Sequence, residues 1–275
     1  MKNIYVLVIL FLLLPINNVN SESMQAYFAD FMNFATLEGI NSDTASVTIP
    51  PEYSACTFSP PNVVFNAGFT SGLAYRDDVL YGLSWSGEDI SLYSISSGPC
   101  AMGSIITPVI GFSNLESLAY CQDEDMFYSV DFDFPSHLGQ LARIDPTAQN
   151  VSLIGSHMAF DVRITGLVCD INGQLWAATP GHGGRSSELL KINRTTGVET
   201  VVGPTGIAAG IVEALAIDRD KPNGLMYING AGLYEVNTST GNALSLSGSF
   251  DKFYAMAGLP VSNLIFADGF EAGGI

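Results

Sequence analysis

Positive charge is scarce in this sequence. The 275 residues include 10 lysines and arginines against 27 acidic residues, which gives a formal net charge of −17. Such a surface repels phosphate backbones and anionic lipid head groups, so we expect neither nucleic acid nor a membrane as a partner. An acidic surface favours cations and basic partners, and it also keeps a protein soluble.

Long apolar runs are missing as well. The apolar stretch Tyr5 to Leu14 is too short to span a bilayer as a helix. Lys2 precedes it, Pro15 ends it, and small residues follow at Val19 to Ser21. This order is typical of a signal peptide, so we expect residues 1–21 to be removed and the protein to be secreted or periplasmic.

Recognised catalytic motifs are also absent. The sequence contains no nucleophile elbow, P-loop, HExxH, dinucleotide fingerprint or calcium loop of the DxDxDG type. The acidic stretches Gln122 to Asp125 and Asp218 to Gly224 fall at turns, where Asp170 also lies. Because the acids recur with a repeat, we interpret them as turn-forming residues in preference to metal ligands.

What the sequence does contain is a repeat of 45 to 49 residues. Each unit has a small apolar strand with a leucine, a turn, a strand with an aromatic residue, a loop, a third apolar strand, and a turn such as NRTTG. The first-strand leucines are Leu73, Leu118, Leu167 and Leu215; the aromatic residues are Tyr81, Tyr128, Trp176 and Tyr227. Four short strands per unit at this period predict an all-β fold, a β-propeller.

The ends of the chain predict how the ring closes. Tyr254 to Gly258 matches a fifth first strand, Asn263 to Asp268 a second strand, and Cys56 to Ala67 an outer strand. We therefore expect five four-stranded blades closed by N-terminal outer strands, near Ser46 to Phe65, with six or seven blades as the alternative. The propeller would occupy residues 46–268. Residues 22–45 would form an N-terminal segment with a short helix in Met24 to Ile40, and residues 269–275 a tail.

The repeat resembles that of secreted bacterial propellers of the YVTN and quinoprotein-amine-dehydrogenase-β-chain-like group. The shared pattern is LAY, a turn, LY, then LY-x-I and an NxTTG-like turn, over roughly Gly72 to Pro260. The resemblance implies the fold and no redox role, because nothing matches a quinone-bearing partner chain. The end IFADGFEAGGI resembles a DGFE-type tail of secreted proteobacterial proteins, which implies a bacterial origin.

The four cysteines fit no zinc pattern. Cys56 and Cys100 lie at equivalent positions of neighbouring outer strands, about a blade width apart, so we expect no bridge between them. Cys121 and Cys169 lie on adjacent inner strands, one residue out of register. We expect them to be buried thiols in preference to a disulfide.

Repeat symmetry also predicts a candidate site. Two residues before each first-strand marker, a ring at one mouth of the channel would contain Ser71, Glu116, Thr165, Glu213 and Tyr254. The loops between second and third strands add Trp85, Glu88, Asp131, Asp133, His137, His182 and Arg185. Glu116 and Glu213 would repel each other across the mouth, which suggests a weak site for a divalent cation such as calcium or for a basic ligand. Alternatively, both glutamates cap loops.

Two classes of function fit these patterns. The first is a monomeric binding or scaffold propeller for an unidentified protein, glycan or small ligand. The second is a cation-dependent hydrolase similar to the lactonases, which use acidic and amide residues of inner strands. The sequence has the acids without the accompanying asparagines, so we favour binding over catalysis.

Overall fold

The computed structural model describes most of the repeat region and several strands at the ends of the chain. The described ranges are 25–29, 37–41, 46–48, 69–77, 79–86, 89–95, 102–109, 112, 115–133, 138–158, 164–181, 186–208, 214–217, 226–229, 232–248 and 255–259. Within these ranges no helix is long and apolar enough to cross a membrane.

The described strands form five antiparallel four-stranded sheets. The first sheet contains β4 (Phe69–Arg76), β5 (Val79–Ser86), β6 (Asp89–Ile95) and β7 (Met102–Val109). The second contains β8 (Leu115–Cys121), β9 (Met126–Asp133), β10 (Leu138–Asp145) and β11 (Asn150–Ile154). The third contains β12 (Gly166–Cys169), β13 (Leu175–Ala178), β14 (Glu188–Ile192) and β15 (Glu199–Pro204). The fourth contains β16 (Ala214–Ile217), β17 (Met226–Asn229), β18 (Gly232–Val236) and β19 (Ala243–Gly248).

The closing sheet joins the two ends of the chain. Its order is β20 (Ala255–Leu259), β1 (Gln25–Ala29), β2 (Leu37–Asn41) and β3 (Ser46–Thr48). The prediction of a short helix in Met24 to Ile40 was therefore wrong. The aromatic and apolar residues of QAYFA serve as a strand that pairs with β20, so tertiary pairing overrides the mixed apolar spacing. The segments predicted as strands at Cys56 to Ala67 and Asn263 to Asp268 lie outside the described residues.

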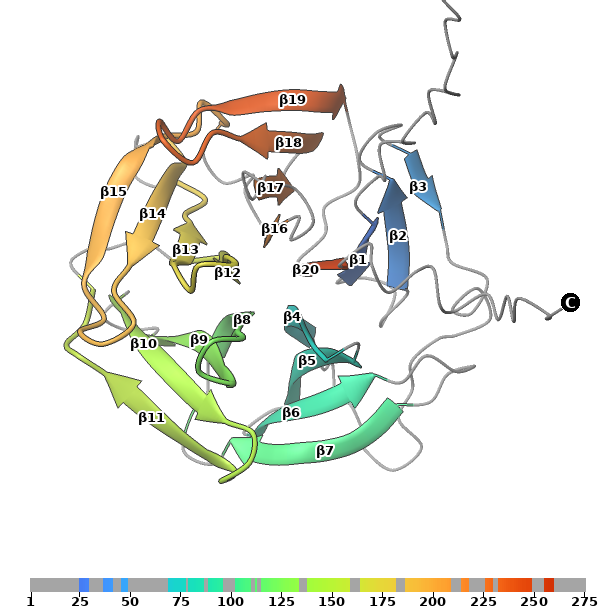
Figure 1. The fold of residues 1–275 in the computed structure, drawn as a ribbon, viewed down its shortest axis with the longest axis vertical. Coiled ribbons are helices and arrows are strands. Elements are labelled where there is room, and N and C mark those ends of the chain that lie inside the picture. The colour runs from blue at the N-terminus through green and yellow to red at the C-terminus, as the bar shows by residue number, and fades with distance from the viewer. Residues whose placement is uncertain are drawn as a thin grey trace, which may run out of the picture.

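The five sheets stand round a common axis with their first strands innermost (Figure 1). Each inner strand contacts the next, in the cyclic order β4, β8, β12, β16, β20 and back to β4. Because the ring closes on itself, no inner strand is left with an open side. This is the arrangement of a β-propeller, as the sequence repeat predicts, and the four leucine markers lie on β4, β8, β12 and β16.

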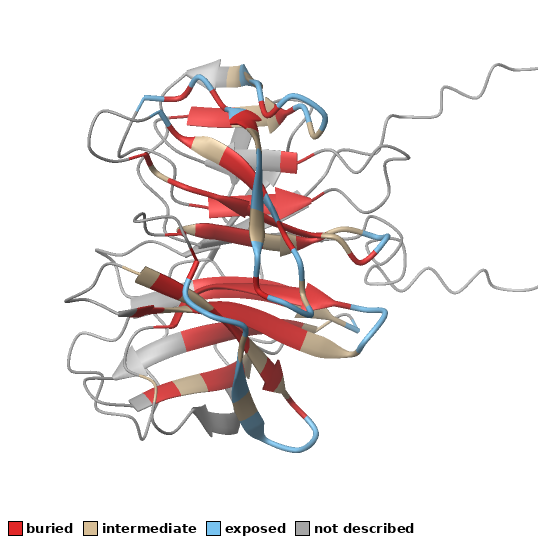
Figure 2. Ribbon diagram, turned by 90° about the vertical axis from the view of Figure 1, so that its left-hand side faces the viewer, coloured by how far each residue is buried: buried red, intermediate tan, exposed pale blue. Residues whose placement is uncertain are grey.

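Burial falls from the axis to the rim. Every residue of β8 is buried, whereas β11, the outer strand of the same sheet, has only exposed and half-buried positions. Figure 2 shows the buried strands in red and the exposed turns that join them in pale blue. Apolar clusters fill the space between neighbouring sheets. Tyr81 of the first sheet, for example, packs on Phe127 of the second at 5.0 Å between ring centroids.

The turns between third and fourth strands explain the recurrent NxTTG pattern. The side-chain oxygens of Asp145, Asn193 and Asn237 each accept hydrogen bonds from backbone amides two and three residues later. Gly197 and Gly241 end two of these turns with φ of 72° and 82°. Both glycines also press against the preceding sheet: a Cβ on Gly241 would meet the carbonyl of Gly203.

A disulfide joins the second and third sheets, so the expectation of two free thiols at Cys121 and Cys169 was wrong. Their Cα atoms are 5.2 Å apart, within the range that a bridge spans. The one-residue offset predicted from the sequence therefore does not keep the two cysteines apart. Ala119 to Cys121 pairs regularly with β9, and the shift in the register of β8 lies before it, between Glu116 and Ala119. The prediction for Cys56 and Cys100 falls outside the described residues.

Candidate functional site

The structure describes only part of the ring predicted at the channel mouth. Glu116 lies at the start of β8 and is 8% exposed. Thr165 is half-buried just before β12, and its amide donates to the carbonyl of Ala178. Asp131 is half-buried on β9. For the remaining predicted positions, the side chains or the whole residues lie outside the described part: Ser71, Trp85, Glu88, Asp133, His137, His182, Arg185, Glu213 and Tyr254.

The backbone that follows Glu116 is held in an unusual conformation. Ser117 has φ of 63°, in the left-handed region, at the irregularity of β8. The buried hydroxyl of Ser129 donates toward the carbonyls of Glu116 and Ser117, at 3.1 and 2.8 Å. This bulge orients the entry of β8, and the sequence markers gave no sign of it.

The acidic turn Gln122 to Asp125 binds the sheets on either side. Arg76 of the first sheet donates through Nη2 to Asp125 at 2.8 Å. Arg194 of the third sheet donates to both oxygens of Asp123, at 2.9 and 2.6 Å, and its Nη1 lies 3.3 Å from Glu124. Planar guanidinium groups match carboxylates in this bidentate way. These acids therefore hold neighbouring sheets together, a role that the turn interpretation missed.

The pKa values follow from these pairs. The hydrogen bond from Arg194 holds the pKa of Asp123 below its usual value, against the opposing effect of burial. Burial, and then the hydrogen bond to Asp125, raise the pKa of Tyr120 to about 12. Burial, followed by the hydrogen bond to Glu124, also raises the pKa of Tyr128. Both phenols remain neutral donors to the acidic turn at neutral pH.

The described residues contain one group with metal-ligand spacing, and it does not suit a metal. Ligand atoms of Cys121, Asp123 and Cys169 lie within 4.8 Å of one another. The two sulfurs are bonded to each other, so neither is the thiolate that metals require. Asp123 is already paired with Arg194.

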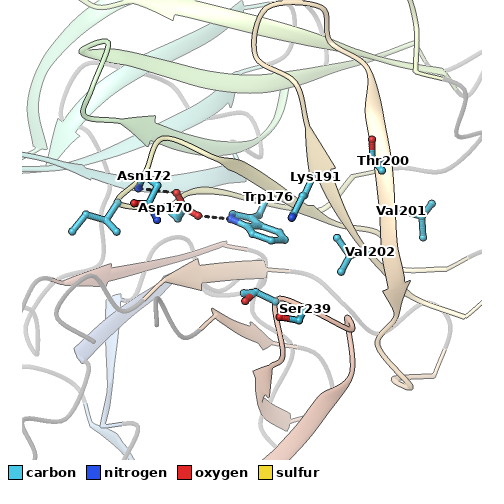
Figure 3. A pocket seen from close by; sticks show the side chains of 10 residues that line it. Asp170, Asn172, Trp176, Lys191, Thr200, Val201, Val202 and Ser239 are labelled. Atoms are coloured by element: carbon cyan, nitrogen blue, oxygen red, sulfur yellow. Dashed lines mark hydrogen bonds between the residues drawn. The ribbon is translucent and has the colours of Figure 1, made fainter. Parts of the chain in front are cut away.

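A groove of about 640 Å³ opens between the third and fourth sheets (Figure 3). We call it the intersheet groove. Its lining residues are Asp170, Ile171, Asn172, Trp176, Lys191, Thr200, Val201, Val202, Thr238 and Ser239. In the close-up, Trp176 and Lys191 of the third sheet lie side by side, and Ser239 of the fourth sheet lies across from them.

The floor of the intersheet groove is a row of side chains across the third sheet. Trp176 of β13, Lys191 of β14 and Thr200 of β15 are successive partners in the ladder, so their side chains share one face. The Lys191 ammonium lies 4.9 Å from the centre of the Trp176 ring. Trp176 Nε1 donates to Asp170 at 2.9 Å, which fixes the indole at the inner end of the row.

Asp170 shapes the turn at the edge of the intersheet groove. Its Oδ1 accepts the amides of Asn172 and Gln174, both at 2.9 Å. Gly173 follows with φ of 78°. Here the interpretation of the acid as a turn-forming residue is confirmed.

The preceding junction shows why the intersheet groove exists. Thr238 follows Asn237 as Arg194 follows Asn193 in the equivalent turn. At the junction between the second and third sheets, Arg194 extends to Asp123 and bridges the two sheets. At the next junction, Thr238 is too short to do so, and the space stays open.

The intersheet groove opens at the end of the sheets opposite to the predicted ring. Its turns connect first to second strands and third to fourth strands, whereas His137 and His182 belong to connections between second and third strands. In an antiparallel four-stranded sheet these two sets of connections lie at opposite ends. The site predicted from the sequence therefore belongs to the opposite end of the sheets. Aligning residues 193–197 with 237–241 shows the Arg-to-Thr change and would have pointed to this junction.

No family model and no curated protein matches this chain. Among solved structures it is similar to a chain of a nidogen–laminin complex, with a TM-score of 0.52 and 14% identity over 86% of this chain and 98% of that one. It is also similar to a putative gluconolactonase, with a TM-score of 0.53 and 12% identity over 84% of this chain and 80% of that one. At these identities the likeness shows the fold, and the chain is a β-propeller. The two neighbours differ in kind, since one was solved in a protein complex and the other is a putative enzyme.

Proposed function

We propose that this protein is an exported, monomeric, five-bladed β-propeller that acts as a binding module. The five sheets and the cyclic contacts of their inner strands support the blade number. The leader-like N-terminus supports export, and so does the disulfide between Cys121 and Cys169, because such bridges persist in oxidising compartments.

The observation that carries the binding function is the intersheet groove. Its volume lies within the range of small-molecule sites. Its lining combines exposed apolar residues, such as Ile171 at 68% and Val201 at 44%, with hydroxyl, amide and ammonium groups. The equivalent space one sheet earlier contains a pair that bridges the sheets.

The alternative is a cation-dependent hydrolase similar to the lactonases, with Glu116 and Glu213 holding a cation such as calcium at the channel mouth. The burial of Glu116 on an inner strand is the observation that favours it. Carboxylate oxygens are ligands that calcium prefers in proteins. On our proposal, however, Glu116 has a structural role at the entry of β8.

Ligand-observed NMR with a library of saccharides, short peptides and small organic acids tests the binding function on the mature protein. We expect hits that the Thr238→Arg variant abolishes, because the longer side chain fills the intersheet groove as Arg194 fills the preceding junction. Thr147→Arg is the matched control. It adds the same group to the exposed turn of the second sheet, and its hits should match those of the wild type.

Metal analysis and lactone hydrolysis test the alternative. Two results together would show a hydrolase instead of a binding module. The protein would bind stoichiometric calcium that a chelator removes, and the Glu116→Gln, Glu213→Gln double variant would lose lactone turnover. If Thr238→Arg leaves the hits unchanged, the ligands do not bind in the intersheet groove.

A further inference from the structure

We propose that the intersheet groove selects a small organic acid, and that the Lys191 ammonium binds its carboxylate. This inference rests on the proposed binding function and adds the chemical class of the ligand. It comes from the balance of charges at two equivalent junctions between sheets.

The junction between the second and third sheets, which we call the closed junction, contains both halves of an ion pair. Arg194 supplies the cation from the third-to-fourth-strand turn, and Asp123 and Glu124 supply the acids from the first-to-second-strand turn of the preceding sheet. Only 16% of the Arg194 side chain is exposed, so its guanidinium is largely withdrawn from water. The charge of Arg194 is therefore balanced by these two carboxylates.

The junction between the third and fourth sheets, which we call the open junction, has neither the arginine nor the acids of that ion pair. The turn Asp170 to Gly173 carries Ile171 and Asn172 where the preceding repeat has the acidic turn, and Thr238 replaces the arginine. The carboxylate that remains, Asp170, already accepts three N–H donors, from Asn172, Gln174 and Trp176. Its oxygens are therefore committed to the turn and the indole.

A cation remains in the open junction. Lys191 lies on the floor of the intersheet groove and is exposed, and within the described part of the chain it makes no ion pair. Its contact there is the Trp176 ring. That contact positions the ammonium without neutralising it, so the groove attracts an anion.

The other lining groups define the rest of the ligand. Ser239 lies across from the Trp176–Lys191 row (Figure 3), and Thr238 also lines the groove from the fourth sheet. The hydroxyl of either residue can donate to a carboxylate oxygen. Val202 and Ile171, which also line the groove, offer apolar contact. A short apolar body bearing one carboxylate matches this lining.

The charge of the whole protein narrows the class further. With a net charge of −17, the protein repels polyanions at long range. A small monoanion suffers least from that repulsion and can still gain the local attraction of Lys191. The intersheet groove therefore suits a single carboxylate better than an acidic polymer.

N-acetyl-leucine and its uncharged amide test this proposal. The protein has 2 tryptophans, so its ¹⁵N spectrum shows two indole signals, and the Trp85→Phe variant assigns that of Trp176. We expect the acid at millimolar concentrations to shift the Trp176 indole signal. We also expect it to bind about two- to fivefold more tightly than the amide, as one solvent-exposed ion pair allows. Added salt should narrow the difference.

Variants of Lys191 separate charge from shape. Lys191→Gln should reduce binding of the acid to the level of the amide, and Lys191→Arg should retain the preference. Equal binding of acid and amide to the wild type would overturn the carboxylate assignment and leave the binding function intact. So would a shift confined to Trp85, or no shift with either probe. The library screen with Thr238→Arg then judges the binding function independently.

Discussion

Two neighbouring junctions of this propeller are built from the same repeat but differ in the contacts that join their sheets. Between the second and third sheets, a disulfide, an arginine paired with two acids, and a glycine contact join the sheets. Between the third and fourth sheets, the glycine contact remains, while a threonine replaces the arginine and a groove opens. A repeat fold therefore allows one junction to be opened while its neighbours maintain the ring.

The glycine contacts are what the two junctions share. A Cβ on Gly155 would overlap the carbonyl of Thr196 in the third sheet, and a Cβ on Gly203 would overlap that of Thr240 in the fourth. The outer strand of one sheet thus lies directly against the turn of the next. Because this contact is backbone to backbone, it holds the spacing of the sheets whatever side chains fill the rest of the junction.

Removal of the disulfide should have the largest effect. The Cys121→Ala, Cys169→Ala double variant loses a bridge that closes a loop of 48 residues. We expect a loss of about 2–4 kcal/mol in the free energy of unfolding, measured by urea denaturation. Intact mass under denaturing conditions should first confirm the bridge in the wild type. A variant with the wild-type midpoint would show that the second–third junction does not depend on it.

A methyl group at the shared glycine contact should have an effect of similar size. Gly155→Ala introduces a Cβ against the backbone of Thr196 at a φ of 69°. Overpacking of this kind costs about 1–3 kcal/mol, in addition to about 1 kcal/mol for the left-handed backbone.

Gly206→Ala is the matched control for this substitution. Gly206 has a similar φ of 75°, and nothing lies within 4 Å of its added Cβ. It should lose only about 1 kcal/mol, the backbone contribution. Equal losses in the two variants would show that the contact between sheets contributes nothing.

Exchanging the residues that distinguish the junctions should have a smaller effect. Arg194→Thr opens the second–third junction and should cost about 1 kcal/mol, because the paired carboxylates remain partly exposed to water. Thr238→Arg should leave stability near that of the wild type. Comparing the two by thermal unfolding tests whether the ion pair or the glycine contact holds the sheets. A loss well above that in Arg194→Thr would mean that the pair is central to the junction.

Much of the architecture was predictable, because leucines and aromatic residues recur at buried inner positions and their spacing reports the sheet repeat. Junctions between sheets were harder to predict, because their contacts join residues far apart in the sequence. Cys121 and Cys169 are 48 positions apart, and Arg194 and Asp123 are 71 positions apart. The helix predicted near the N-terminus failed for a related reason: its partner, β20, lies at the other end of the chain. The candidate site depended on a position that differs among the turns between third and fourth strands: Pro146, Arg194 and Thr238. The residues that the repeats share therefore gave no sign of it.

The smallest expected effect is on the pH dependence of the closed junction. The pKa of Asp123 is lowered in the folded protein by the hydrogen bond from Arg194, whereas in the unfolded chain it is about 3.9. The stabilisation is therefore fully present above that unfolded value and is lost as the pH falls through the lower folded value. Since 46% of the Asp123 side chain is exposed, water and salt screen the pair, and the change should be small. We expect the stability difference between wild type and Arg194→Thr to persist at pH 7 and to shrink below about pH 4, by urea denaturation across that range. A difference that is independent of pH would mean that Arg194 acts through packing alone, and the contrast between the two junctions would then be one of volume and not of charge.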